Sequence, residues 1–304
     1  MHLYGYQHPS YAHSFRCYGE PIHLPRSNAW LLRRSVPGSP YHDAMGLYPL
    51  FICRDWSKLS LDLKALSRQW IALSLVTDPF GEFDHQELSA CFPDVCMPFK
   101  IHHIINLNQP RSAFISQHHQ RYARKALKTV SIDVCEYPNA YLKEWTKLYH
   151  DLIKRHDIKG MTRFSDSIFS VHLNVPGSVV FKAMVEDRIT GMQIWYQIND
   201  KAYYHLGACN DEGYANHAAF GLFWTAIEYF EKNDVLRLNL GSGAGTTKGK
   251  EDGLTRFKRG WANDSQTVYF CGVVSQSTPY QAMTYSSTAK SNGYFPAYRT
   301  GEFS

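Results

Sequence analysis

A glycine-rich loop followed by a cluster of cations is the stretch of this sequence whose residue types could do chemistry. Residues 236–261 read LRLNLGSGAGTTKGKEDGLTRFKRGW, which predicts a short strand, a loop and a basic segment. Lys258 lies in that basic segment among two arginines and two aromatic residues, Arg256, Phe257, Arg259 and Trp261. Lys258 could neutralise an anion beside the flexible loop. The other interpretation is that it belongs to a solvated basic face on a strand or turn.

The loop imitates two nucleotide-binding motifs and fits neither. The segment LNLGSGAG looks like the opening strand and glycine loop of Rossmann methyltransferases, but only about 60 residues follow it, and that fold needs further βα units. A P-loop does not fit because Ala244 replaces its first glycine and Glu251 replaces its magnesium-binding hydroxyl. We therefore expect Gly241, Gly243 and Gly245 to form either a loop that closes over a substrate or a plain mobile loop.

The composition is that of a globular protein with room for one large domain or two ordinary ones. Of 304 residues, 44% are hydrophobic and 19% are charged, and the formal net charge is +5. This charge suits a phosphorylated ligand or RNA but falls short of a nucleic-acid-binding composition, and no DNA partner is expected. The seven cysteines form no CxxC pair, and neither a signal peptide nor an apolar run of about 18 residues is visible. We expect a cytoplasmic protein with reduced cysteines and no membrane span.

Fifteen histidines raise the question of a metal site. The densest spots are the adjacent pairs His102-His103 and His118-His119. Adjacent side chains point to opposite faces of a strand, and on a helix they lie about 100° apart, so neither pair is spaced for chelation. No metal is expected.

Hydrophobic periodicity predicts the elements that must position these residues. Residues 139–157 carry apolar side chains at three- and four-residue spacing and are expected to form a helix. A meander of three strands, a second helix and two further strands are expected at 178–187, 188–200, 201–210, 216–234, 235–241 and 267–275. The chain then divides into an irregular N-terminal arm, two lobes and an extended or mobile tail, at 1–27, 28–130, 131–276 and 277–304.

The order of elements after residue 131 resembles the core of a GNAT-type acyltransferase. Within that superfamily, the sequence resembles the Fem-like branch, which holds the Fem-type peptidoglycan aminoacyltransferases. The matching segments are RYARKALKTVSIDV, YLKEWTKLYHDLIKRHDIKGMTRFSDSIF, KAYYHLGA, AAFGLFWTAIEYFEKNDVLRLNLGSGAG and DGLTRFKRGW. The resemblance implies an α/β (α+β) fold of tandem GNAT-like lobes, the first degenerate, each with a mixed, mainly antiparallel sheet flanked by helices.

The resemblance also implies an activity. It suggests an N-acyltransferase that moves an acyl group from acyl-CoA, or a similar thioester, to the amine of a small molecule or peptide, with no permanently bound cofactor. Two alternatives stay open: transfer from aminoacyl-tRNA to a cell-wall precursor or peptide, and a non-catalytic binding protein of the same fold. The tRNA alternative is less favoured because the sequence lacks the helical-hairpin insertion of some Fem-type enzymes.

Four residues are the candidates for catalysis. By resemblance, Lys258 lies in the acyl-transfer cleft and holds a phosphate or stabilises an oxyanion. Alternation along the strand places Tyr203 and His205 on one face, and the ordinary pKa of histidine makes His205 the candidate general base, with a hydrogen-bonded core histidine as the other interpretation. Asp252 is expected to orient Lys258 or to accept a proton.

Further residues are expected to bind substrates. The resemblance places the donor's pyrophosphate at the start of the second helix and beside the loop, with the candidates Asn216, His217, Ala218, Gly241, Gly243 and Arg256. Arg124 and Lys125 could bind an anionic acceptor or simply form a cationic helix end. Arg155 and His156 match the motif of the Fem-like branch and are also expected to bind substrate.

Overall fold

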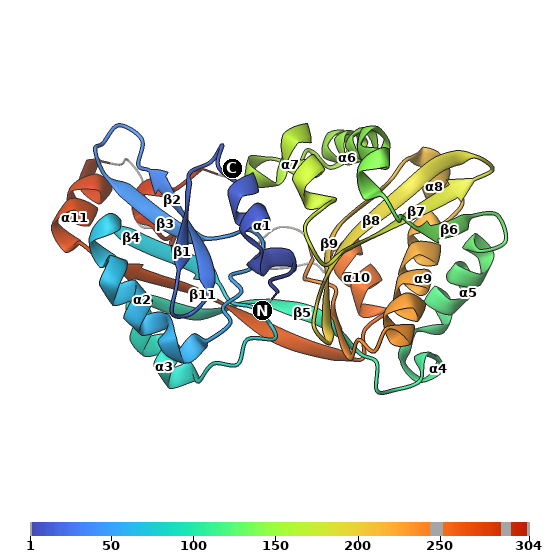
Figure 1. Ribbon diagram of the computed structural model, residues 1–304, viewed down its shortest axis with the longest axis horizontal. Coiled ribbons are helices and arrows are strands. Elements are labelled where there is room, and N and C mark those ends of the chain that lie inside the picture. Colours follow the sequence, from blue (N-terminus) through green and yellow to red (C-terminus); the bar gives the residue numbers. More distant parts are fainter. Residues whose placement is uncertain (1, 244–251, 287–292, 303–304) are drawn as a thin grey trace. The chain divides into compact units, whose positions relative to one another are not determined.

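The structure is a computed structural model that describes residues 2–243, 252–286 and 293–302. The chain forms two compact units, one built from Met1–Gly5 and Ile101–Gln266 and the other from Tyr6–Lys100 and Thr267–Ser304. We call them the 101–266 unit and the 6–100 unit. Each combines a sheet with flanking helices (Figure 1).

The boundaries of these units differ from the lobes expected from the sequence, which divided the chain at residues 130 and 276. Besides the crossing after Gly5, the chain passes between the units twice, and both of these crossings fall inside strands, in β5 (Val95–Asn106) and β11 (Asp264–Val274). The cause is a long-range pairing, because Ile104–Asn106 of β5 lie antiparallel to β10 (Arg237–Asn239). The end of β5 therefore belongs with strands that follow it by more than a hundred residues.

The sheet of the 101–266 unit is mixed and mainly antiparallel. Its strand order is β5-β10-β9-β8-β7-β6, and only β9 and β10 are parallel neighbours. The remaining bounds are Ser131–Val134 for β6, Ser178–Val185 for β7, Arg188–Ile198 for β8 and Lys201–Cys209 for β9. The predicted meander of three strands is confirmed.

Helices cover both faces of this sheet (Figure 1). Helices α5 (Gln117–Ala126) and α9 (Ala218–Lys232) belong to one hydrophobic cluster, in which Phe223 and Phe230 pack against Trp195 of β8. On the other face, α6 (Leu142–His156) and α7 (Asp166–His172) pack together through Trp145 and Phe169. The short helices are α4 (Arg111–Phe114), α8 (Asp211–Ala215) and α10 (Gly253–Arg259). Both strongly periodic helices of the sequence analysis are therefore confirmed.

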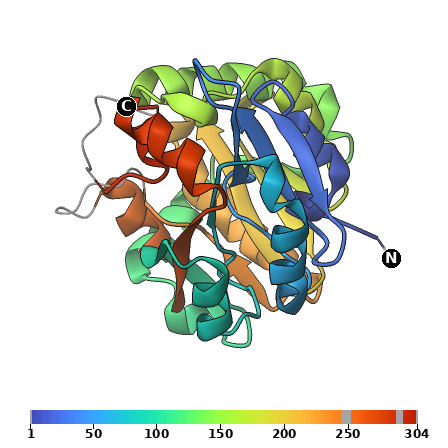
Figure 2. The same ribbon diagram turned by 90° about the vertical axis from the view of Figure 1, so that its left-hand side faces the viewer.

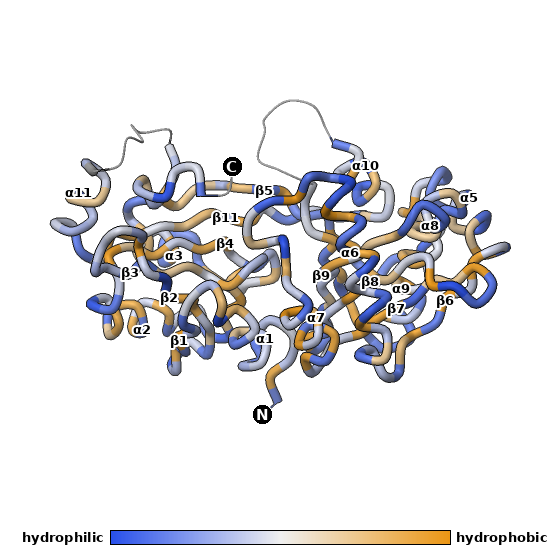
Figure 3. Tube along the Cα trace, turned by 90° about the horizontal axis from the view of Figure 1, so that it is seen from above, coloured by the Kyte–Doolittle hydropathy of each residue, from blue (hydrophilic) through white to orange (hydrophobic). Residues whose placement is uncertain are grey.

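The 6–100 unit repeats the same kind of architecture. Its strand order is β1-β2-β3-β4-β11, with one parallel pair, β3-β4. The strand bounds are Glu20–Leu24, Ala29–Ser35, His42–Gly46 and Ala72–Val76 for β1 to β4. Strand β4 is hydrophobic along most of its length (Figure 3), and it is largely buried between β3 and β11.

Two helices pack on one face of this second sheet. Leu63 of α2 (Leu59–Leu66) and Leu88 of α3 (His85–Cys91) share a buried cluster with Trp70. Helix α1 (Pro9–Ser14) and strand β1 fall within the segment expected to be an irregular arm. Together the two units confirm the expected fold class of mixed, mainly antiparallel sheets flanked by helices.

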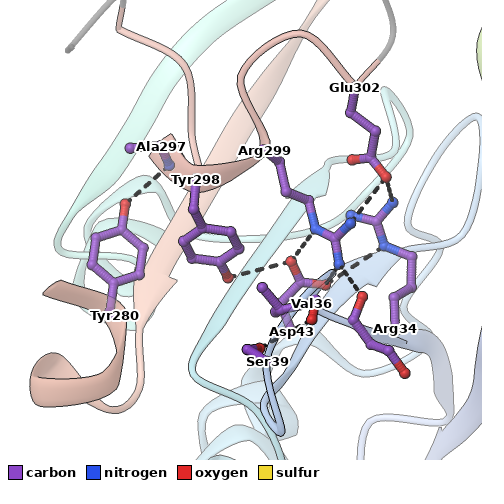
Figure 4. Close-up of polar contacts among 10 residues, drawn as sticks. Arg34, Val36, Ser39, Asp43, Tyr280, Ala297, Tyr298, Arg299 and Glu302 are labelled. Atoms are coloured by element: carbon purple, nitrogen blue, oxygen red, sulfur yellow. Dashed lines mark hydrogen bonds and ion pairs between the residues drawn. The ribbon is translucent and has the colours of Figure 1, made fainter. Parts of the chain in front are cut away.

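The described part of the tail, which was expected to be extended or mobile, contains helical segments. Residues Ser277–Ser286 form helix α11 (Figure 2), and Ala297–Arg299 form a 3₁₀ turn. Arg299 is buried, and its guanidinium binds the carboxylate of Asp43 on β3 (Figure 4). The sequence hid this contact because the partners lie at opposite ends of the chain. Within the described ranges, no helix is long and apolar enough to cross a membrane.

Candidate functional site

The two parallel strands of the 101–266 unit pair over a short distance and then separate. Strands β9 and β10 are paired from Lys201 with Arg237 to Tyr203 with Asn239. Strand β10 ends there, whereas β9 continues to Cys209 and keeps β8 as its neighbour. We call this point the fork and define it by Tyr204 on β9 and residues 240–243 after β10. A point where parallel strands part exposes backbone groups that no strand neighbour uses.

Lys258 reaches the fork from helix α10. Its side chain is only 6% exposed, and its Nζ donates a hydrogen bond to the carbonyl oxygen of Ser242 at 2.7 Å. The same Nζ lies 5.6 Å from the centre of the Tyr204 ring. The neighbouring Phe257 and Trp261 pack with the hydrophobic core of the 101–266 unit. A nearly buried ammonium therefore lies between the two separating strands.

The segment that carries Lys258 is a helix and not the strand or turn considered in the sequence analysis. Asp252 caps it, because one carboxylate oxygen accepts a hydrogen bond from the backbone N–H of Thr255 at 2.6 Å. Asp252 therefore stabilises the start of the helix that presents Lys258. Arg256 lies exposed on the same helix.

The local structure explains why glycine occupies the two described glycine positions of the loop. Gly241 has a φ of +75°, a conformation that favours glycine. A Cβ on Gly243 would lie 1.9 Å from the hydroxyl oxygen of Thr255, so a larger residue there would force the Thr255 side chain to move. Gly245 lies outside the described residues. Backbone conformation therefore favours glycine at position 241, and close packing favours it at position 243.

The structure places Tyr203 and His205 on the opposite face of β9 from Tyr204. Tyr203 lies opposite Tyr196 of β8, and the His205 ring stacks on Tyr196 at 4.8 Å. His205 is 7% exposed, and its Nε2 lies 3.0 Å from Nδ1 of His172. The expected shared face of Tyr203 and His205 is confirmed, but these contacts separate it from Lys258. They favour the core interpretation of His205 over the general base.

The buried histidine pair predicts loss of stability in mild acid. Burial lowers the pKa of His172 to about 3, and burial together with His172 lowers the pKa of His205 well below its ordinary value. In the unfolded chain both take up protons below about pH 6.5, whereas the folded chain resists protonation. As the pH falls from 6.5 towards 5, the free energy of unfolding should drop by up to about 1.4 kcal/mol per pH unit for each histidine.

Urea denaturation at pH 7.5, 6 and 5 measures this dependence. The double variant His172→Gln/His205→Gln should show a shallower slope with pH than the wild type, even if it is less stable throughout. The single change of the exposed His156 to Gln serves as the control and should keep the wild-type slope. An unchanged slope in the double variant would refute the assignment.

The expected donor-binding residues lie at the start of α9, close to α5. Asn216 accepts a hydrogen bond from the hydroxyl of Thr129 at 3.3 Å, and Ala218 is fully buried. His217 adopts a left-handed conformation and packs edge-on against the Tyr122 ring at 4.6 Å. Side chains and the end of α5 thus lie against the helix start that the resemblance assigns to a pyrophosphate.

The expected substrate-binding residues are either exposed or have a structural role. Arg124 and Lys125 are exposed in the last turn of α5, and His156 is exposed at the end of α6. Arg155 donates to the carbonyl oxygen of Cys209 at 3.2 Å and also binds Asp211. Arg155 therefore ties α6 to the end of β9, which gives it a structural role. Within the described ranges, no group of three metal-ligating side chains is present.

Sequence reasoning missed one pair of residues next to the fork. Nδ1 of His102 lies 3.0 Å from Oδ1 of Asn239, and both side chains are buried. The same Oδ1 accepts a hydrogen bond from the backbone N–H of Gly241 at 2.8 Å. The available signal was an asparagine between two leucines at the end of a strand, where a buried polar side chain needs partners.

The comparisons with known proteins concern the fold. No family model and no curated protein matches the chain. Among solved structures, FemX has a TM-score of 0.64 at 14% identity, covering 90% of this chain and 93% of its own. The C-terminal domain (DUF2156) of a protein from Agrobacterium fabrum, described as a lysylphosphatidylglycerol synthetase, has a TM-score of 0.61 at 13% identity, covering 91% and 89%. L-PGS from Bacillus licheniformis has a TM-score of 0.55 at 12% identity, covering 92% and 96%. The chain therefore shares the fold of FemX and of these two proteins.

Proposed function

We propose that this chain is an acyltransferase in which Lys258 stabilises negative charge at the fork. The observation that carries the proposal is the ammonium of Lys258, 6% exposed and held by the Ser242 carbonyl where β9 and β10 part. Acyl transfer passes through a tetrahedral oxyanion, and a fixed positive charge in a poorly solvated place stabilises such an intermediate strongly. The acceptor is an amine, as the Fem-like resemblance implies.

For the donor, we propose an aminoacyl ester carried on RNA. A basic surface made by α5, the turn after it and α10 favours this polyanion. It consists of Arg121, Arg124, Lys125, Lys128, Arg256 and Arg259, all exposed. The two helices are joined, because the Ser116 N–H donates to the Gly260 carbonyl at 3.0 Å and Nε2 of His119 lies 2.8 Å from the Phe257 carbonyl. Neither 117–129 nor 253–263 contains an acidic residue.

Four of the six side chains of this basic surface carry a charge that is available to a ligand. In the part of the chain that the structure describes, Arg121, Arg124, Lys125 and Lys128 form no ion pair with a carboxylate. Cations that meet no internal anion attract phosphate groups, and their contribution weakens as salt is added. The similarity in fold to FemX and to a lysylphosphatidylglycerol synthetase, whose name states an aminoacylated product, is consistent with an aminoacyl donor.

An acyl-CoA donor is the second candidate. One observation favours it: β9 leads through α8 into the 15-residue helix α9, whose first N–H groups could receive a pyrophosphate. The packing of Tyr122 on Phe220 and His217 brings α5 against that helix start. Because α5 packs against the helix start that would receive the pyrophosphate, we place the acyl-CoA thioester second to the RNA-borne aminoacyl ester.

Binding of the two donors distinguishes these candidates. The double change Arg124→Glu/Lys125→Glu should weaken binding of aminoacyl-tRNA by about tenfold or more at 100 mM salt and lower the salt dependence by about two charges. Binding of acetyl-CoA, followed by calorimetry, should not change. Fluorescence anisotropy of labelled tRNA at 50, 100 and 200 mM salt measures the first effect.

The matched control is Lys143→Glu/Lys147→Glu, two exposed lysines four residues apart on α6. This variant should bind tRNA as the wild type does. Micromolar binding of acetyl-CoA with no binding of tRNA would overturn the RNA donor and support the thioester. Failure to bind either donor would favour a non-catalytic protein of this fold.

A further inference from the structure

The loop between β10 and α10 is held at the end of β10 by a buried side-chain amide. Asn239 is 3% exposed and is the last residue of β10. Its Oδ1 accepts the N–H of Gly241 at 2.8 Å and lies 3.0 Å from Nδ1 of His102. One partner from β5 and one from the residues after β10 therefore meet at one oxygen atom.

The hydrogen-bond partners determine the orientation of the amide and the tautomer of the histidine. A backbone N–H can only donate, so the Asn239 atom that faces Gly241 must be the oxygen. His102 must then donate from Nδ1 to that same oxygen, because two acceptors cannot bond. The three residues therefore form a hydrogen-bonded chain, in which the Asn239 oxygen accepts both the Nδ1–H of His102 and the backbone N–H of Gly241.

This chain leads to the ammonium of Lys258. Gly241 has a φ of +75°, and its carbonyl accepts the N–H of His103 at 3.0 Å. With both backbone groups of Gly241 bonded, the direction of the following peptide is restricted. The Ser242 carbonyl belongs to the next residue and accepts Nζ of Lys258 at 2.7 Å. Side chains of β5 and β10 thus govern where the carbonyl that holds Lys258 points.

We propose that Asn239 and His102 are positioning residues for Lys258. They hold Gly241 and thereby aim the Ser242 carbonyl, which keeps the ammonium at the fork. The consequence for acyl transfer rests on the function proposed above, while the placement of Lys258 does not. On this proposal, removing the Asn239 oxygen releases Lys258.

The reactivity of Lys258 towards an amine-directed acylating reagent tests the placement without any enzyme assay. Mass spectrometry follows acylation of each lysine over time, with the exposed Lys232 as the internal reference. Asn239→Leu, which removes the acceptor at similar size, should raise the acylation rate of Lys258 by about tenfold. Asn239→Asp, which keeps an acceptor oxygen, should leave it near the wild-type rate.

The control is Ile104→Val, which trims a fully buried side chain opposite Asn239 in the β5–β10 pairing and removes no hydrogen bond. It should not change Lys258 reactivity. An unchanged rate in Asn239→Leu, or an equal rise in Ile104→Val, would overturn the proposal.

Transfer kinetics give the second readout. In Asn239→Leu, kcat should fall by about tenfold with KM within about twofold of the wild type, because the change affects charge stabilisation and not donor binding. Asn239→Asp should recover most of kcat. If Lys258 reactivity rises as expected but the wild type transfers no acyl group, the proposed function fails and the positioning role stands.

Discussion

Replacing Lys258 by methionine should lower kcat/KM for acyl transfer by a factor of about 10² to 10³. Methionine keeps a long, flexible side chain against Tyr204 and removes the charge together with the hydrogen bond to Ser242. The loss should appear in kcat, since the ammonium acts on the charge that develops in the transition state. Steady-state transfer with a saturating acceptor amine, using the donor that binds, measures the effect.

Two controls separate catalysis from folding in this experiment. Lys232→Met removes an exposed lysine at the end of α9 and should keep full activity. Thermal unfolding of Lys258→Met should show a folded protein. Wild-type kcat in Lys258→Met would sink the assignment of this residue, whatever donor the protein uses.

Local sequence patterns were sufficient for the elements that build the site. Helix α9 repeats aromatic and aliphatic residues at helical spacing, and Phe223, Ile227 and Phe230 are indeed buried in the core. The strands β7 to β9 are separated by short turns, so their pairing follows from chain continuity. Periodicity and short connections are local properties, and a single sequence contains them in full.

Two parts of the site depend on information that is not local. Helix α10 has only seven residues, too few for a hydrophobic period, and it depends on the Asp252 cap. The bond between His102 and Asn239 joins positions 137 residues apart. Such a contact follows from which strands become neighbours, and periodicity does not determine strand order.

His205 illustrates a third limit. Alternation correctly separated it from Tyr204, yet it could not decide which face of β9 carries the chemistry. That decision depends on Lys258 arriving from α10 on one side and on His172 arriving from α7 on the other. The sequence could therefore locate the strand and its two faces, while tertiary packing assigned their roles.

The Asp43→Asn variant should lose about 3–5 kcal/mol in free energy of unfolding. Asp43 is fully buried on β3, and its carboxylate binds the guanidinium of Arg299 and accepts the hydroxyl of Tyr298 at 3.3 Å. The guanidinium of Arg34 lies 3.6 Å away, and Glu302 bonds both arginines (Figure 4). The two arginines and the two carboxylates of this buried cluster therefore balance in charge. The asparagine of the variant has the size of aspartate but lacks its negative charge. Urea denaturation at pH 7.5 measures the change.

A second substitution tests whether the charge is the cause. In the double variant Asp43→Asn/Arg299→Gln, one cation faces one carboxylate again, so part of the lost free energy should return. Glu87→Gln, an exposed acid on α3, should stay within about 0.5 kcal/mol of the wild type. If Asp43→Asn were within about 1 kcal/mol of the wild type, the cluster would not be the anchor of the tail. If the double variant were no better than the single one, the loss would come from broken hydrogen bonds and not from an unbalanced charge, because only the charge balance is restored by the second change.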